Sequence, residues 1–312
     1  MKCINLTSGR FSRLPAGCFL ALGCFDGLHA GHCTLLWEAS SRANARGVPF
    51  AVWTPVGAKD VSHIRDAASR KSALRFCHVE YCIEEPFEAI KDLSPRAFFE
   101  TYLVGKYRVS GLACGENFTF GKDRAGNADT LRALCAKYGV ELYVQPTVCF
   151  DGEPVSDTRI RALLSQGDLS AAWDMSFGSY SLRAAPQKGR GVGHKLGFPT
   201  VNLPLPDDFL LPNGVYCGSL IKKTGTSVDA CPAIINIGVH PTFEPAEKRL
   251  CEVHLLKQPD REIGNHPVSV MFLKRLRPEI AFSSPEELKA QIARDVQAAR
   301  EFWTDEDGNL GY

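Results

Sequence analysis

The spacing of apolar residues changes once along this chain, near Gly178, and the change limits the folds available to it. Before it, short apolar runs alternate with stretches of helical periodicity. After it, the segments are short, β-rich and broken by Gly, Pro and Asn. The 312 residues are enough for two domains of roughly 100–200 residues each. We therefore predict two domains, residues 1–177 and 178–312.

The first half predicts an α/β domain. Phe19–Leu22 is typical of a buried strand, and a helix is expected from about Gly31 to a stop at Gly47. Further elements are expected at these ranges: strands at Val48–Trp53, Val109–Cys114 and Glu141–Val148, and a helix at Asn127–Tyr138. Such alternation of strands and helices predicts a parallel sheet covered by helices on both faces.

The second half predicts an antiparallel β-barrel closed by one helix. Its strands are expected around Gly214–Tyr216, Ala233–Ile237, Cys251–Leu256 and Val268–Leu273. The sequence Ser284-Pro285-Glu286-Glu287 is typical of a helix start, with a capping serine, a proline at the first helical position and a capping-box glutamate. An apolar stripe then predicts that this helix packs on the barrel; it consists of Leu288, Ile292 and Val296.

The charge balance and the hydropathy exclude several classes of protein. With 36 basic and 35 acidic residues, the net charge is +1, which argues against an extended nucleic-acid groove or an acidic-membrane surface. No apolar run is long enough to cross a bilayer, and the start MKCINLTSGRF lacks the apolar stretch of a secretory signal. We expect a cytoplasmic protein with small-molecule partners, no nucleic acid and no membrane.

The 12 cysteines do not show metal-ligand spacing, because none are arranged as C-x-x-C and the closest pair, Cys77 and Cys82, has no nearby Cys/His partner set with zinc spacing. Most occur in apolar runs, where cysteine acts as a small hydrophobe; examples are Cys24, Cys114, Cys217 and Cys231. We expect reduced, structural thiols.

A turn containing two histidines is the sharpest local feature. The segment from Gly23 to His32 reads GCFDGLHAGH and lies between a buried strand and a helix, where backbone N–H groups and the helix dipole favour an anion. His29 and His32 are three residues apart, so both can point at one phosphate and stabilise charge building on phosphorus. Alternatively, His29 caps the helix while His32 packs or is solvated.

Two later segments can also meet a nucleotide. Asn117 lies in GENFTFG (115–121); the alternative is a turn residue beside two core phenylalanines. The segment Ser156-Asp157-Thr158-Arg159-Ile160-Arg161 starts a short helix, where hydroxyls and an arginine suit a triphosphate. Without such a ligand, Asp157 would be an N-cap and Arg161 a solvated charge.

A glycine-rich segment opens the second half. Residues 188–203 read KGRGVGHKLGFPTVNL, so the backbone can approach a phosphate chain closely. Thr200 and Asn202 alternate at a strand start and offer two oxygens on one side, the kind of hard ligand that suits Mg²⁺. The alternative is a solvated glycine hairpin.

The first half resembles the nucleotidyltransferase superfamily, whose HxGH motif matches residues 29–32, and within it the FMN adenylyltransferase module of bacterial FAD synthetases. Segments 115–121 and 155–161 are similar to further motifs of that module. The resemblance implies a Rossmann-like sheet, with His29 and His32 catalytic. It also implies a set of residues that bind the substrate or nucleotide: Gly23, Phe25, Asp26, Asn117, Ser156, Thr158 and Arg161.

The second half resembles riboflavin kinases, whose signature ends G-F-P-T-A-N, here with Val201 in place of Ala. Later segments follow that family in order: 212–216, 236–238, 241–243, 252–254 and 277–279. The resemblance implies Glu252 as the general base, Thr200 and Asn202 as Mg²⁺ and ATP ligands, and Arg277 at a flap over the flavin. It also implies substrate or nucleotide binding by four further residues: Gly189, Gly193, Lys195 and Gly197.

Together the two resemblances imply ATP-dependent phosphorylation of riboflavin to FMN and adenylylation of FMN to FAD, with Mg²⁺ as cofactor and FMN and FAD as product ligands. Two departures motivate an alternative, a riboflavin kinase with a weakened or inactive adenylyltransferase domain. Asp157 replaces a family serine, and the stretch with Thr54 and Val56 lacks a family acidic residue and histidine. A third possibility is a non-catalytic flavin-binding protein; the retained histidines and Glu252 argue against it.

Overall fold

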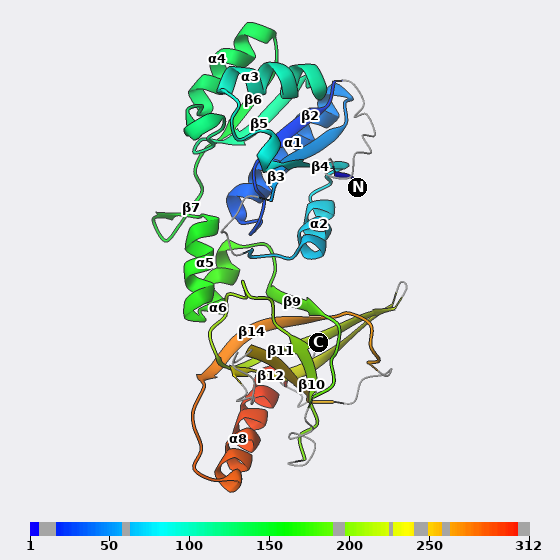
Figure 1. Ribbon diagram of the computed structural model, residues 1–312, viewed down its shortest axis with the longest axis vertical. Coiled ribbons are helices and arrows are strands. Elements are labelled where there is room, and N and C mark those ends of the chain that lie inside the picture. Colours follow the sequence, from blue (N-terminus) through cyan, green and yellow to red (C-terminus); the bar gives the residue numbers. More distant parts are fainter. Residues whose placement is uncertain are drawn as a thin grey trace. The chain divides into compact units, whose positions relative to one another are not determined.

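The chain forms two compact units in the computed structural model (Figure 1). Residues 1–5, 17–57, 63–189, 197–224, 227–239, 249–257 and 263–304 are described. The N-terminal unit comprises Met1–Arg159 with Met175–Phe177, and the C-terminal unit comprises Ile160–Asp174 with Gly178–Tyr312. Residues 160–174 thus group with the second unit, and the functional domain bounds of 1–177 and 178–312 stay a prediction.

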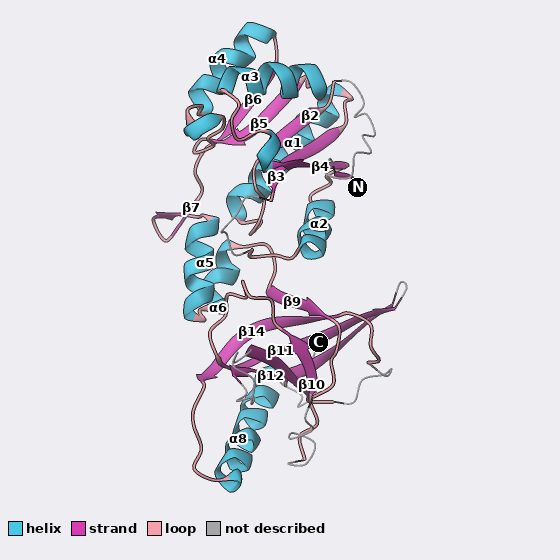
Figure 2. Cartoon of the chain, in the orientation of Figure 1, coloured by secondary structure: helices cyan, strands magenta, loops and turns pink. Residues whose placement is uncertain are grey.

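The N-terminal unit is built on a six-stranded parallel sheet with the order β1-β4-β3-β2-β5-β6 (Figure 2). Its strands are β1 (Lys2–Asn5), β2 (Phe19–Leu22), β3 (Phe50–Val56), β4 (Tyr81–Pro86), β5 (Gly111–Gly115) and β6 (Glu141–Gln145), and a hairpin follows, β7 (Cys149–Phe150) and β8 (Glu153–Pro154). Its helices are α1 (Ala30–Arg46), α2 (Ala67–Phe76), η2 (Phe87–Ala89), α3 (Pro95–Phe98), η3 (Phe99–Lys106), η4 (Lys122–Arg124) and α4 (Ala128–Tyr138). Two more helices follow in the chain, α5 (Asp157–Gln166) and α6 (Leu169–Met175), and most of their residues group with the second unit.

Alternating residues of the strands fill two cores, one on each face of this sheet. Phe19 and Ala21 of β2 pack with α1 and α2, whereas Leu20 and Leu22 pack with α3, η3 and α4. A parallel sheet buried on both faces is what the strand–helix alternation predicts, and the predicted α/β fold is confirmed. Several strand ends of this sheet differ from expectation by up to three residues. Two of them lie beside a proline, which has no N–H for a sheet ladder: β3 begins after Pro49, and β6 ends before Pro146.

The C-terminal unit is an antiparallel sheet with the order β10-β13-β12-β11-β14-β9. Its strands are β9 (Tyr180–Ala184), β10 (Val201–Pro204), β11 (Gly214–Thr224), β12 (Ser227–Val239), β13 (Arg249–Leu255) and β14 (Val268–Pro278). A bridge between Gln187, just after β9, and Asn202 of β10 joins the two edges of the sheet. The predicted barrel is thereby confirmed. Buried side chains line its inner face, among them Tyr216, Ile235, Ile237, Cys251, Val253 and Phe272.

Helix α8 (Pro285–Trp303) covers part of the outer face. It begins as expected, with Ser284 Oγ accepting the N–H of Glu287 at 3.2 Å, although the Glu287 carboxylate returns to the N–H of Ser283 instead of Ser284. Val296 packs against the barrel, but the predicted apolar stripe is not the whole contact. Asp295, beside it, is the most deeply buried charged side chain of the helix and meets Arg277 of β14.

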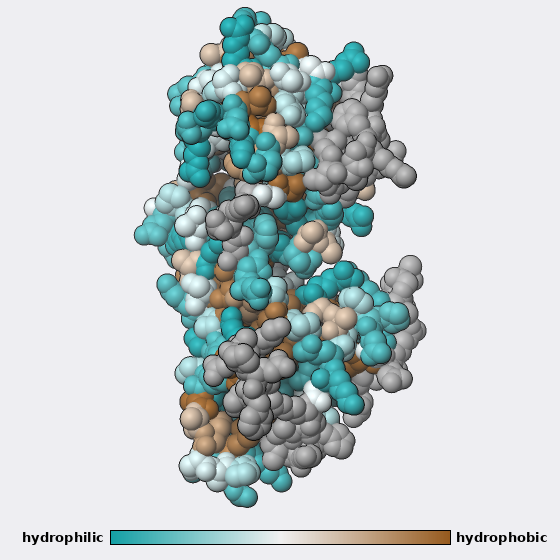
Figure 3. Space-filling view, in the orientation of Figure 1, coloured by the Kyte–Doolittle hydropathy of each residue, from teal (hydrophilic) through white to brown (hydrophobic). Residues whose placement is uncertain are grey.

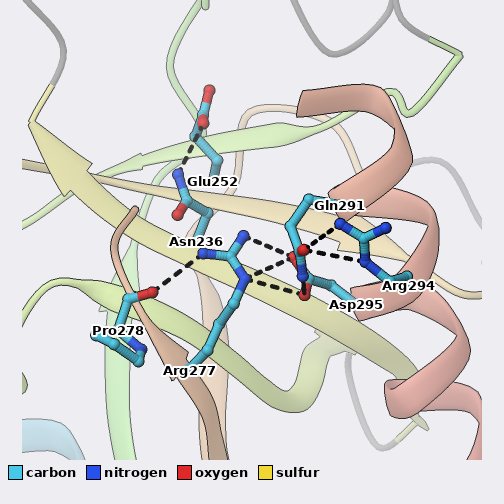
Figure 4. A network of polar contacts seen from close by, with 7 residues as sticks. All are labelled: Asn236, Glu252, Arg277, Pro278, Gln291, Arg294 and Asp295. Atoms are coloured by element: carbon cyan, nitrogen blue, oxygen red, sulfur yellow. Dashed lines mark hydrogen bonds and ion pairs between the residues drawn. The ribbon is translucent and has the colours of Figure 1, made fainter. Parts of the chain in front are cut away.

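The Arg277–Asp295 pair is bidentate and largely removed from water (Figure 4). Arg277 Nε lies 3.0 Å from Asp295 Oδ1, and another guanidinium nitrogen lies 2.6 Å from Oδ2. The two side chains are 18% and 7% exposed. Gln291 Nε2 donates to the same carboxylate at 2.7 Å. The helix is therefore attached to β14 by a satisfied, buried charge pair.

An Asp295→Asn variant should be less stable than the wild type by about 3 kcal/mol, because it leaves the Arg277 guanidinium buried without its counter-charge. Chemical denaturation gives the difference in unfolding free energy. Glu301→Gln, an exposed change on the same helix, is the control and should shift that free energy by less than about 0.5 kcal/mol. Equal stability of both variants would contradict the assigned role of the pair.

On the visible face, apolar residues are scattered among polar ones (Figure 3). Among the described residues, no helix combines the length and apolar character needed to span a membrane. In that same part of the chain, 11 cysteines are free thiols, and nine of them are buried as expected. Cys24 was expected to be buried and is exposed, because it lies in the turn after β2 rather than in the strand.

Candidate active sites

The two histidines of the N-terminal unit lie together at the start of α1. His29 is the N-cap, and its Nδ1 accepts the backbone N–H of His32 at 3.3 Å. The two rings stack with centroids 3.7 Å apart and an angle of 19°. Because Nδ1 of His29 accepts a hydrogen bond, the neutral ring carries its proton on Nε2. Capping and ligand binding are thus compatible, since Nε2–H remains a donor.

Burial keeps both rings neutral near pH 7. Desolvation lowers the pKa of His29, partly opposed by the nearby Asp157 carboxylate. It also holds the pKa of His32 well below 6.5, and His29 lowers it further. Phe25, fully buried, lies behind His32 with ring centroids 5.1 Å apart, and Nδ1 of His32 is buried without a hydrogen-bond partner. The pair can therefore offer neutral N–H donors to an anion.

These lowered pKa values predict that acid weakens the folded state. An unfolded histidine binds a proton near pH 6.5, but the folded site resists it, so the unfolding free energy should fall as the pH drops through and below 6.5. Denaturation at pH 7.5 and pH 5.5 measures the fall. A His32→Asn variant should show a smaller fall, with all other histidines unchanged. The same fall in both proteins would rule out His32 as its source.

Asp157 connects α5 to this turn. Its Oδ1 accepts the backbone N–H of Gly27 at 3.0 Å, and one ligand atom from each of Asp157, His29 and His32 lies within 4.8 Å of the others. Asp157 is therefore not the N-cap of α5, which was the alternative interpretation of this residue. Ser156 has that position, with its Oγ accepting the N–H of Arg159 at 3.2 Å.

The turn is held in shape by hydrogen bonds that the sequence did not predict. Asp26 is buried, and its carboxylate accepts the N–H of Ile64 at 3.0 Å, while Arg65 Nε donates to the carbonyl of Gly27 at 3.3 Å. Thr54 Oγ1 donates to the carbonyl of Cys24 at 3.1 Å. Asp26 thus fixes the segment before α2, and Thr54, a departure from the family pattern, fixes the turn. The one sequence signal for such contacts was the acidic residue, Asp26, within the glycine-rich motif.

The backbone of the turn just before His29 is strained at two residues. Phe25 and Leu28 have φ of 50° and 47°, the left-handed region that costs a non-glycine residue about 1–3 kcal/mol. A Cβ on Gly23 would lie 3.0 Å from the Phe25 ring, so glycine allows that ring to pack. Left-handed residues among right-handed ones can gather N–H groups around an anion.

The remaining residues predicted for this site lie in other elements, and one of them, Arg161, groups with the second unit. Asn117 is exposed in the turn after β5, and Gly115 leaves room for its amide, since a Cβ there would lie 3.0 Å from Asn117 Oδ1. Thr158 is exposed in the first turn of α5, and Arg161 lies one turn further along that helix. Nucleotide contacts by these residues stay predictions.

In the C-terminal unit, the pairing of three strands places polar side chains in one row. Asn202 of β10 and Asn236 of β12 are both directly opposite Glu252 of β13. Directly opposite residues share a face of the sheet, here the outer one. Asn236 Nδ2 lies 3.4 Å from Glu252 Oε2 (Figure 4). The predicted Asn202 and Glu252 are thus brought together. Asn236, which the sequence placed in a family motif without a role, is their neighbour.

The glycine-rich segment approaches this row through Gly189. A Cβ there would lie 2.1 Å from the Asn202 side-chain nitrogen, so a larger residue would displace that side chain, and Gln187 N–H donates to the Asn202 carbonyl at 2.9 Å. Thr200 is half-buried just before β10, and Gly197 has φ 88° in an exposed turn. Gly193 and Lys195, as well as the motif residues 241–243, lie outside the described residues.

Two further motif residues, His254 and Arg277, have partners within the protein. His254 shares the face of Glu252, but its Nδ1 is 2.9 Å from the carbonyl of Pro199, so it holds the segment leading to Thr200. The Arg277 guanidinium binds Asp295, as described above, which attaches a helix to the barrel. A contact of Arg277 with flavin stays a prediction.

The fold and the two polar sites define a two-part transferase: an α/β unit with an HxGH turn and a barrel with an Asn–Glu row. Models of two families match the chain, FAD synthetase over residues 12–159 and riboflavin kinase over residues 177–303. The chain belongs to the family of bifunctional riboflavin kinase/FMN adenylyltransferases.

Similar proteins of that name cover nearly the whole chain. One from Escherichia coli (strain K12) is 33% identical over 297 residues, which is 92% of this chain and 93% of that protein. One from Haemophilus influenzae is 30% identical over 301 residues, 94% and 96% of the two chains. A crystal structure described as a macrolide-efflux protein from Streptococcus pneumoniae is 26% identical, with a TM-score of 0.79 over 92% of this chain and 94% of that one.

Proposed function

We propose that the chain catalyses both reactions of its family, with a separate site for each. Riboflavin is phosphorylated by ATP in the C-terminal unit, and the FMN product is adenylylated by a second ATP in the N-terminal unit. The observation that carries the proposal is that each unit holds its own preorganised polar site, the stacked His29–His32 pair and the Asn202–Glu252–Asn236 row. We place the enzyme in the cytoplasm, acting on small molecules.

In the N-terminal unit, the FMN phosphate attacks the α-phosphorus of ATP and pyrophosphate leaves. His29 offers Nε2–H, and His32 lies stacked beside it, so the pair can stabilise the charge that develops on the phosphoryl oxygens. The neutral state of both rings supports donation rather than charge pairing. Ser156 before α5, Thr158 and Arg161 on α5, and Asn117 after β5 are the proposed nucleotide contacts.

In the C-terminal unit, Glu252 accepts the proton of the ribityl 5′-hydroxyl as that oxygen attacks the γ-phosphorus. Asn236 donates to the carboxylate and fixes its orientation. Oxygens of Thr200 and Asn202 are suitable ligands for Mg²⁺, and the Gly189 backbone lies close to the Asn202 side chain. When bound, Mg²⁺ neutralises phosphate oxygens of ATP. Gly189, Gly193, Lys195 and Gly197 are the proposed phosphate-binding segment.

One assay tests the proposal. The purified chain is mixed with riboflavin, ATP and Mg²⁺, and the flavins are separated by chromatography with fluorescence detection. FAD is the expected product, with FMN as the intermediate. FMN alone would restrict the activity to the C-terminal unit, and unchanged riboflavin would overturn the proposal.

A further inference from the structure

Asp157 places a carboxylate where the N-terminal site should receive an anion. Its Oδ1 takes the N–H of Gly27, a backbone donor of the turn that precedes α1. The side chain is half-buried, and one of its oxygens lies within 4.8 Å of ring nitrogens of both His29 and His32. A phosphate that reaches the two imidazoles must therefore come close to this carboxylate.

Asp157 shares a nearby cation, Arg65, with a second carboxylate. Asp26, the other acidic group at the turn, is also negative and is held by the N–H groups of Ile64 and Arg65. The Arg65 guanidinium is attracted to both carboxylates, so one positive charge is shared between Asp26 and Asp157, and it also donates to the carbonyls of Gly27 and Phe177. His63, exposed, contacts Asp26. The histidine rings are neutral donors that add hydrogen bonds without formal charge.

The Asp157 carboxylate and the phosphate of a nucleotide would accept the same backbone donor. A carboxylate and a phosphoryl group both accept backbone N–H groups beside a helix N-terminus. Gly27 has one N–H, and it is already directed to Asp157. Unit charges about 5 Å apart in a partly exposed site change a binding constant by about tenfold or more. Competition for the donor and repulsion between the charges thus act in the same direction.

We propose that Asp157 is an internal anion that occupies part of the phosphate site of the N-terminal unit and is displaced from Gly27 when the triphosphate of ATP binds. Asp157 thereby sets the affinity of this site for nucleotide. The inference rests on the proposed adenylyltransferase function of the unit and adds a residue that limits nucleotide binding.

The test is an Asp157→Asn variant, which removes the charge and keeps an oxygen that can accept from Gly27. We expect the KM for ATP in FMN adenylylation to fall about tenfold, with kcat changed less than twofold. Inorganic pyrophosphate should inhibit this step at correspondingly lower concentration. The KM for ATP in riboflavin phosphorylation, measured in the same preparation, should stay as in the wild type. Asp157→Ser, which removes the charge and shortens the side chain, should change both constants in the same direction.

The matched control is Asp92→Asn, an exposed change in the turn before α3, which should leave both KM values unaltered. If Asp157→Asn leaves the KM for ATP and the pyrophosphate inhibition unchanged while FAD is still made, the inference is wrong and the proposed function stands. A higher KM for ATP in that variant would also overturn it, because the carboxylate would then help to hold the nucleotide. Absence of FAD from the wild type would overturn the proposed function and this inference together.

Discussion

A Glu252→Gln enzyme should form FMN from riboflavin about 10²–10⁴-fold more slowly and still convert supplied FMN to FAD at the wild-type rate. The amide cannot accept the proton of the attacking hydroxyl, and loss of a positioned general base costs about 10²–10⁴-fold in rate. Glutamine has the size of glutamate and retains an oxygen for the amide of Asn236. The row across β10, β13 and β12 should therefore remain intact, so that the loss reports on chemistry.

The two activities are measured separately, with riboflavin or FMN as the only flavin supplied. Glu301→Gln, exposed on α8, is the control for the same chemical change and should retain both rates. Equal loss of FMN and FAD formation in Glu252→Gln would contradict separate sites. Full retention of FMN formation would remove Glu252 from the mechanism.

A His32→Ala enzyme should show the reverse pattern, with FMN accumulating from riboflavin and little FAD. Removing one preorganised donor to a charged transition state costs about 10²–10³-fold. His29 loses its stacking partner in this variant, but the backbone N–H of residue 32 that its Nδ1 accepts remains. The remaining imidazole should therefore keep its N–H donor while the pair is lost.

Single-turnover assays with FMN and ATP give the rate of the adenylyl step. His266→Ala, which removes an exposed histidine from the C-terminal unit, should leave that rate unchanged. Unaltered FAD output from His32→Ala would exclude the ring from the step. A loss confined to the KM for FMN would instead show that His32 binds the acceptor flavin.

Much of the N-terminal site was predictable because its parts are local. His29 and His32 are three residues apart at a helix start, so helical geometry alone brings their rings to one side. The same holds for Gly47, whose left-handed φ of 64° ends α1 where the sequence predicts a stop. The burial that keeps the two rings neutral was not predictable, since it depends on Phe25 and on the segments packed around the turn.

The sequence could not predict partners that lie far apart along the chain. Asp26 was grouped with the ligand-binding residues, but its carboxylate meets the N–H of Ile64, 38 positions away. Arg277 was assigned to a flap, and its charge is paired with Asp295 on a helix later in the chain. A polar side chain in a motif shows that a partner exists, but only packing selects which partner.

The amino-acid sequence by itself determined the change from parallel α/β to antiparallel β near Gly178, the helix ends and the family, because periodicity, caps and motifs are properties of neighbouring residues. Tertiary structure alone decided that Asn202, Glu252 and Asn236 form one row, since strand register is set by pairing between segments far apart in the chain. It likewise decided that Asp157 takes the amide of Gly27, 130 residues away, and so placed a negative charge at the proposed phosphate site.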